Sequence, residues 1–107
     1  MSELTDLELC KKIAEIEGLG YEELESYRGD TYEEYIIVRS TIFNPLNNKA
    51  LCFDLMLRHE IRVDDVGVYL ATYTSERGGD NFNTGFTDTS AQRAILKAII
   101  HKSENNG

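Results

Sequence analysis

Apolar side chains recur every three or four positions near the start of the chain, which is the spacing of one face of a helix. They are Leu9, Ile13 and Ile16. Thr5 and Glu8 form a capping box ahead of them, and Gly18 is typical of the residue that follows a helix. We therefore expect a first helix from Thr5 to about Glu17.

A second helical stripe begins after Asn44. This residue is a favourable N-cap, and Pro45 suits the first helical position because its missing N–H would be unpaired there. The stripe comprises Leu46, Ala50, Phe53 and Leu57, and it is broadened by Leu51, Leu55 and Met56. The pattern predicts a well-buried helix that runs to about His59.

A third stripe follows Thr89 and Gln92, which form another capping box. It comprises Ala91, Ala94, Ile95, Ala98 and Ile99. Lys97, His101 and Lys102 place positive charge near the helix end, where the helix dipole favours it. We expect residues 103–107 to fray.

Three further segments have the composition or alternation of strands. Residues 35–43 are rich in β-branched and aromatic side chains, and residues 61–74 are apolar on both faces. Residues 82–86 alternate after Gly78-Gly79, a hairpin signal. Strands are therefore expected in all three segments.

The 107 residues predict one domain, residues 1–107. Its fold class is α+β with the order α-β-α-β-β-α. A right-handed crossover places strand 35–43 parallel to strand 61–74, and the hairpin adds an antiparallel strand. The expected result is a small mixed sheet packed by helices, with residues 18–34 as an acidic connecting segment of low order.

The charge balance bears on partners. The chain carries 11 Lys and Arg against 19 Asp and Glu, a net charge of −8, which opposes direct nucleic-acid binding. Most of the excess lies between Glu17 and Glu34. This segment is either a solvated surface or a patch that docks a basic partner or mimics DNA. Its candidate partner-binding residues are Glu22, Glu23 and Glu25.

The sequence offers little for chemistry. Cys10 and Cys52 are far apart and form no C-x-x-C pair, so buried free thiols are expected, with a disulfide as the alternative. His59 and His101 fall at predicted helix ends. No nucleotide-binding, hydrolase or zinc-protease motif occurs. We expect no catalytic residues, no cofactor and no metal.

The predicted hairpin is rich in aromatic residues, and two roles are open for them. They are Tyr69, Tyr73, Phe82 and Phe86. Aromatic side chains fill cores, and they are also frequent anchors at protein interfaces.

The location expected is the cytoplasm. No apolar run approaches the ~18 residues of a membrane span, and the first residues lack the basic start and apolar run of a signal peptide. We expect no membrane association.

Five segments carry a family resemblance. They are Asn44-Pro45-Leu46, the apolar helix 50–56, the extended stretch 68–71, the turn Gly85-Phe86-Thr87, and the helix 91–100. Together they resemble the small phage proteins of the Phage ABA sandwich domain group and the related NinX-type proteins of lambdoid phages. The resemblance covers residues 1–18 and 44–102. It implies a bacteriophage or prophage origin and the host cytoplasm. That family has no established activity or site residues to carry over.

These observations favour a non-enzymatic phage accessory protein that binds a host or phage protein. Two alternatives stay open: an acidic inhibitor that mimics DNA charge against a host DNA-binding protein, and a small enzyme with an unrecognised carboxylate site. The identity of the partner and self-association are not fixed by the sequence.

Overall fold

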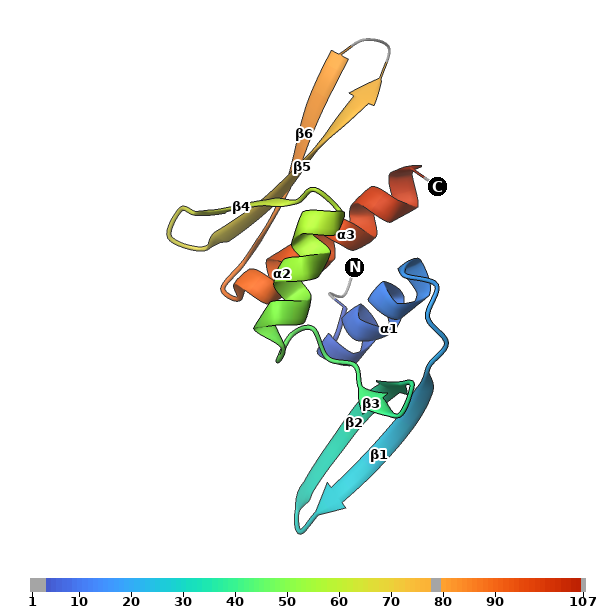
Figure 1. Ribbon diagram of the computed structural model, residues 1–107. Helices are drawn as coiled ribbons and strands as arrows, with labels where there is room; N and C mark the ends of the chain where they lie inside the picture. Colours follow the sequence, from blue (N-terminus) through green and yellow to red (C-terminus); the bar gives the residue numbers. More distant parts are fainter. Residues whose placement is uncertain (1–3, 78–79, 107) are drawn as a thin grey trace.

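A computed structural model describes residues 4–77 and 80–106, with the backbone alone for 75–77, 80–82 and 105–106. Three helices form the body, and two antiparallel sheets project from its opposite ends (Figure 1). In chain order the elements are α1 (Asp6–Ile16), β1 (Glu22–Arg28), β2 (Thr31–Val38), β3 (Thr41–Ile42), α2 (Lys49–Arg58), β4 (Arg62–Asp65), β5 (Tyr69–Arg77), β6 (Asp80–Asp88) and α3 (Ala91–Asn106). The α+β class is confirmed.

The predicted element order and the single mixed sheet are wrong. The described residues form two separate three-stranded antiparallel sheets, in the orders β1-β2-β3 and β4-β5-β6. Helix α2 passes from one sheet to the other (Figure 1), so it is not a crossover between parallel strands. The physical reason is that tight turns cut the predicted strands 35–43 and 61–74, and each strand then pairs locally.

The acidic segment 18–34 is not a loose connection. Strand β1 pairs with β2 from Glu22 opposite Ile37 to Arg28 opposite Thr31. Gly29, at φ +61°, opens the two-residue loop between them. Because glutamate has a low strand propensity, the composition of residues 22–28 does not predict a strand there.

A second tight turn ends β2. Arg39 and Ser40 adopt φ values of 52° and 66°, a left-handed conformation that non-glycine residues seldom take. After this turn Phe43 N–H donates a hydrogen bond to the Ile36 carbonyl at 3.0 Å. Both side chains are buried, so they anchor the first sheet to the helices.

Helix α1 begins and ends as predicted. Thr5 Oγ1 accepts a hydrogen bond from Glu8 N–H, and the Glu8 carboxylate accepts one from Thr5 N–H. At the other end Gly18 has φ +70°, and Leu19 N–H donates to the Ala14 carbonyl. This is the left-handed C-terminal cap for which glycine is suited.

Helix α2 begins four residues later than expected. Asn48 is the N-cap, and its side chain accepts a hydrogen bond from Leu51 N–H at 3.1 Å. Asn44 instead closes a turn, because its side chain accepts from Leu46 N–H. Leu46, the first residue of the predicted stripe, therefore lies before the helix.

The stripe expected to be buried is largely exposed, and α2 faces the core with the side that broadens this stripe. Cys52 and Leu55 are buried, whereas Phe53 is 57% and Leu57 is 59% exposed. The helix carries two apolar faces, and only one of them packs against the rest of the fold.

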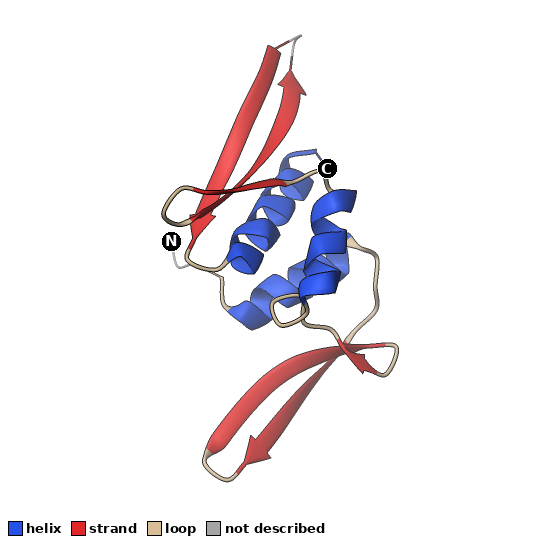
Figure 2. Cartoon of the chain, turned by 60° about the vertical axis from the view of Figure 1, so that its left-hand side comes forward, coloured by secondary structure: helices blue, strands red, loops and turns tan. Residues whose placement is uncertain are grey.

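Helix α3 lies at the centre of the fold. It contacts α1 and α2 and covers one face of β5 and β6 (Figure 2). Ser90, not Thr89, supplies the capping oxygen, which accepts from Arg93 N–H at 3.3 Å. The helix continues to Asn106 rather than fraying from residue 103, because no helix breaker intervenes and Glu104 pairs with Lys12 of α1 at 3.7 Å.

The second sheet contains the predicted hairpin. Strands β5 and β6 pair from Tyr69 opposite Asp88 to Arg77 opposite Asp80. Residues Gly78-Gly79 of the expected loop lie outside the described residues. The extended segment 61–74 is divided by a turn that contains Gly67 at φ +99°, and this turn creates β4.

Candidate protein-binding surface

The hairpin aromatics predicted as one candidate surface take different places. Tyr73 is only 4% exposed, and its hydroxyl lies within hydrogen-bond distance of His101 Nδ1. Phe86 packs on the core, with its ring centroid 4.9 Å from that of His101. Core packing is thus the role of these two residues. Tyr69 is 37% exposed, and the side chain of Phe82 lies outside the described residues.

Most of the exposed apolar surface gathers around α2. Five of the eight large hydrophobic residues that are exposed in the described part of the chain lie on α2 or in and after the β4–β5 turn. They are Phe53, Leu57, Val66, Val68 and Tyr69. We call these five residues the α2 apolar surface. Phe53 and Leu57 are four residues apart and share one helix face.

A hollow of about 290 Å³ lies within this surface. Its lining residues are Lys49, Cys52, Phe53, Tyr69, Ala91, Gln92 and Ile95. Phe53 and Tyr69 come from α2 and β5, while Cys52 and Ile95 are buried and supply apolar surface from α2 and α3. The hollow therefore brings together three elements that are distant in sequence.

The thiols do not supply a nucleophile. Cys10 and Cys52 are both free and buried, as predicted. Burial raises the pKa of each thiol to about 11. Because the thiolate is the reactive form, both groups are protonated and inert at neutral pH.

Sequence reasoning missed Phe53 and Leu57 as surface residues. The stripe that contains them begins at Leu46 and predicts a buried helix face. A signal was present, however: Leu51, Leu55 and Met56 made the apolar face wider than one buried contact needs. An excess of apolar positions on a helix indicates a second apolar face that does not pack against the rest of the fold.

The predicted acidic patch forms the arm made by β1 and β2. Glu22, Glu23 and Glu25 are all exposed on β1. Glu23 forms an ion pair with Lys11 of α1, so its charge is partly neutralised. Glu25 lies directly opposite Glu34 of β2, and such like-charged cross-strand neighbours repel each other.

Two exposed tyrosines lie nearer the tip of the arm, on the face that holds Glu25 and Glu34. The ring centroids of Tyr27 and Tyr32 are 4.9 Å apart, and Tyr27 is 73% exposed. The Tyr32 hydroxyl donates a hydrogen bond to Glu34 Oε1 at 2.8 Å. This bond raises the pKa of Tyr32, because the neighbouring carboxylate disfavours a phenolate.

Glu17, at the start of the acidic segment, has a structural role. Its side chain is 11% exposed and forms ion pairs with Arg58 and with His59, the latter at 3.0 Å. Lys102 Nζ donates to the His59 carbonyl at 2.6 Å. These contacts fasten the ends of the three helices together, so Glu17 is not free to meet a partner.

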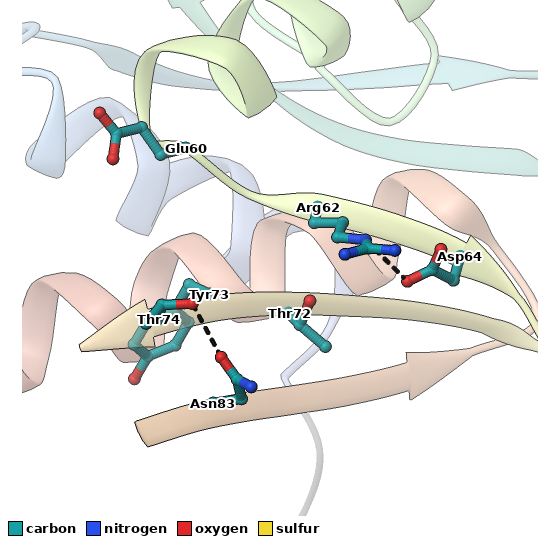
Figure 3. Close-up of a pocket in the computed structure, with 7 residues that line it drawn as sticks. All are labelled: Glu60, Arg62, Asp64, Thr72, Tyr73, Thr74 and Asn83. Atoms are coloured by element: carbon teal, nitrogen blue, oxygen red, sulfur yellow. Dashed lines mark hydrogen bonds and ion pairs between the residues drawn. The ribbon is translucent and has the colours of Figure 1, made fainter. Parts of the chain in front are cut away.

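A polar hollow of about 280 Å³ lies on the second sheet (Figure 3). Its lining residues are Glu60, Arg62, Asp64, Thr72, Tyr73, Thr74 and Asn83. Arg62 pairs with Asp64 at 3.3 Å, and Thr74 Oγ1 donates to Asn83 Oδ1 at 2.8 Å. Figure 3 shows Glu60 apart from Asp64. The polar groups mostly satisfy one another, and the lining pairs no nucleophile with a base.

Within residues 4–77 and 80–106, no three or more His, Cys, Asp and Glu side chains are grouped to hold a metal ion. In the same residues, no helix has the length and apolar character needed to cross a membrane.

Comparison with known proteins gave no significant match to a family model, to a curated protein or to a solved structure. The resemblance to the phage proteins therefore stays a prediction, and the functional argument rests on the surfaces described above.

Proposed function

We propose that this protein is a non-enzymatic binding protein whose α2 apolar surface docks onto another protein. One observation carries the proposal: Phe53 and Leu57 project from α2 while the opposite face of the same helix fills the core. Exposed aromatic and aliphatic side chains that share one helix face and border a hollow are typical of interaction sites.

The dimensions of the hollow favour a protein partner over a metabolite. Its volume of about 290 Å³ is at the lower limit for small-molecule sites, which also need several convergent polar groups. Lys49, Gln92 and the hydroxyl of Tyr69 are the polar side-chain groups among the lining residues, and the rest of the lining is apolar or a buried thiol. A single aromatic or aliphatic side chain of a partner, with Phe53 and Tyr69 beside it, fits this composition better.

The enzyme alternative has less support. The polar hollow of the second sheet contains two carboxylates, but Asp64 is engaged by Arg62 and Glu60 stands apart (Figure 3). The buried thiols are held protonated. The resemblance described above supports a phage or prophage origin and action in the host cytoplasm, where the partner is a host or phage protein.

The test compares partner capture by three immobilised proteins: wild type, the double variant Phe53→Ser with Leu57→Ser, and the control Ile42→Ser. Ile42 is 61% exposed on β3, which belongs to the first sheet, at the base of the arm made by β1 and β2 (Figure 1). Its loss removes a similar apolar group without touching the α2 apolar surface. All three proteins should unfold at similar denaturant concentrations, because the changed side chains are exposed.

We expect wild type and Ile42→Ser to retain the same partner and the double variant to lose it. The partner is then purified and its affinity measured with each protein. Unchanged affinity for the double variant contradicts the proposal. So does specific turnover of a substrate by the isolated chain.

A further inference from the structure

The arm formed by β1 and β2 has an unused edge. Strand β1 is at the end of its sheet, and among the strands of the described residues it pairs only with β2. Figure 2 shows the far half of this ribbon extending away from the helices. A two-stranded ribbon is at best marginally stable by itself, so this half of the arm gains little from the core.

The loop fixes which backbone groups point outward. Arg28 and Thr31 flank the two-residue loop, and in such hairpins the flanking pair exchanges hydrogen bonds. Pairs alternate along the ribbon, so Glu25 and Tyr27 belong to non-hydrogen-bonded pairs. Their N–H and C=O groups are therefore directed to the open edge and can receive another strand.

The side chains beside this edge are acidic and aromatic on one face. Glu25 faces Glu34, and Tyr27 faces Tyr32. Within the described residues, no Lys, Arg or His forms an ion pair with Glu25 or Glu34. A cation placed between these two carboxylates would relieve their repulsion, and the neighbouring tyrosine ring offers a cation–π contact.

We propose that β1 accepts, as an added edge strand, a basic extended segment of a partner protein in which Lys or Arg alternates with apolar residues. The basic side chains lie beside Glu25 and Tyr27, on the face that also holds Glu34. The apolar side chains lie on the opposite face, beside Leu24. Main-chain hydrogen bonds supply affinity, and the alternation of side chains supplies specificity.

Charge selects this occupant over a second copy of the chain. A β1-to-β1 pairing would bring Glu22, Glu23 and Glu25 of both copies to one seam, in a protein that already carries a net charge of −8. Like charges across a strand pair destabilise it, and charged edge strands are a common barrier to self-association. A basic strand meets no such barrier.

This inference does not depend on the α2 apolar surface, because α2 lies in the helical body and the tip of the arm extends away from it (Figure 1). The experiment on the β1 edge can therefore contradict this inference without affecting the proposal for the α2 apolar surface, and the reverse also holds.

The test titrates the ¹⁵N-labelled protein with a synthetic peptide, Lys-Val-Arg-Val-Lys-Val-Arg, and follows amide shifts and hydrogen exchange. A peptide of the same composition with its basic residues in one block serves as the pattern control. The test variant is Glu25→Gln with Glu34→Gln. The matched control is Glu22→Gln with Glu33→Gln, which removes two charges from the other face of the same ribbon.

We expect the alternating peptide to protect the amides of Glu25 and Tyr27 from exchange and to shift β1 signals more than those of α2. The test variant should bind about tenfold more weakly, and the matched control less than threefold, in low salt. Equal losses in both variants, equal binding of the block peptide, or no β1 response at millimolar peptide overturns the proposal.

Discussion

Two leucines on α2 provide a matched test of which helix face belongs to the core. Leu55 is fully buried, whereas Leu57 is 59% exposed. The two residues share a helix, a side-chain type and nearly the same distance from its end. Substitution of each by Ala therefore changes the same chemistry in two environments.

The expected difference follows from burial. Leu55→Ala removes a fully buried isobutyl group and leaves a cavity, at a cost of about 2.5–4 kcal/mol in the free energy of unfolding. Leu57→Ala exposes little new surface, and the higher helix propensity of Ala offsets part of any loss, so its change should stay within about 0.5 kcal/mol. The total stability of such a domain is only ~5–15 kcal/mol.

Urea denaturation followed by far-ultraviolet circular dichroism measures both changes. With a slope near ~1.5 kcal/mol per molar urea, the Leu55 variant should lose about 2 M in its midpoint, while the Leu57 variant stays close to wild type. If the Leu57 variant loses as much as the Leu55 variant, the face that we assign to a partner is part of the core, and the proposed function loses its basis.

Three further outcomes follow from the structure. Ser90→Ala should cost about 0.5–2 kcal/mol of stability and Thr89→Ala almost nothing by urea titration, because only Ser90 caps α3; equal effects would contradict that cap. Burial favours a higher pKa for the Asp88 carboxyl, but hydrogen bonds from Lys97 and Ser90 outweigh it and lower that pKa. The resulting stability is present above the ordinary value of 3.8 and is lost as pH falls through the lowered pKa, so Asp88→Asn should flatten the fall in urea midpoint below pH 3.8; an unchanged slope argues against this network. Cys10 and Cys52 should react with a thiol reagent only as fast as the chain unfolds, and rapid labelling of the native protein would show that they are accessible.

The helices were the most predictable part of the fold. The α1 capping box and its terminal glycine have local causes, and both occur as the sequence indicates. For α2 the stripe located the helix but not its phase. Asn44 and Asn48 are both good N-caps, and only the packing of Phe43 and Pro45 against the core decides between them.

The strands were less predictable because their ends depend on unusual turns. Arg39 and Ser40 take left-handed conformations without Gly or Asn to mark them. Strand β1 consists largely of residues with low strand propensity, and it forms because β2 offers a complementary edge with Gly29 at the loop. The loop glycine is a local signal for this hairpin, but the composition of β1 is not, because strand preference depends on the fit to the partner strand.

The candidate surface was partly predictable. Charge and aromatic content singled out the acids on β1 and the ring of Tyr69, which are exposed, and their part in binding stays a prediction. The sequence could not show whether Tyr73 is buried or exposed, because the residue beside its hydroxyl, His101, is 28 positions away. Phe53 was predicted to be buried, because an apolar residue on a helical stripe is most often in the core.

The most direct measurement for the central claim is an NMR titration of the ¹⁵N-labelled protein with the partner purified by wild-type capture. The account predicts that line broadening concentrates on the outer face of α2 and at Tyr69, and that the amides around Asp64 and Asn83 in the polar hollow change little. Perturbation centred on the polar hollow, with α2 unaffected, would contradict the claim that this protein acts through its exposed apolar helix face.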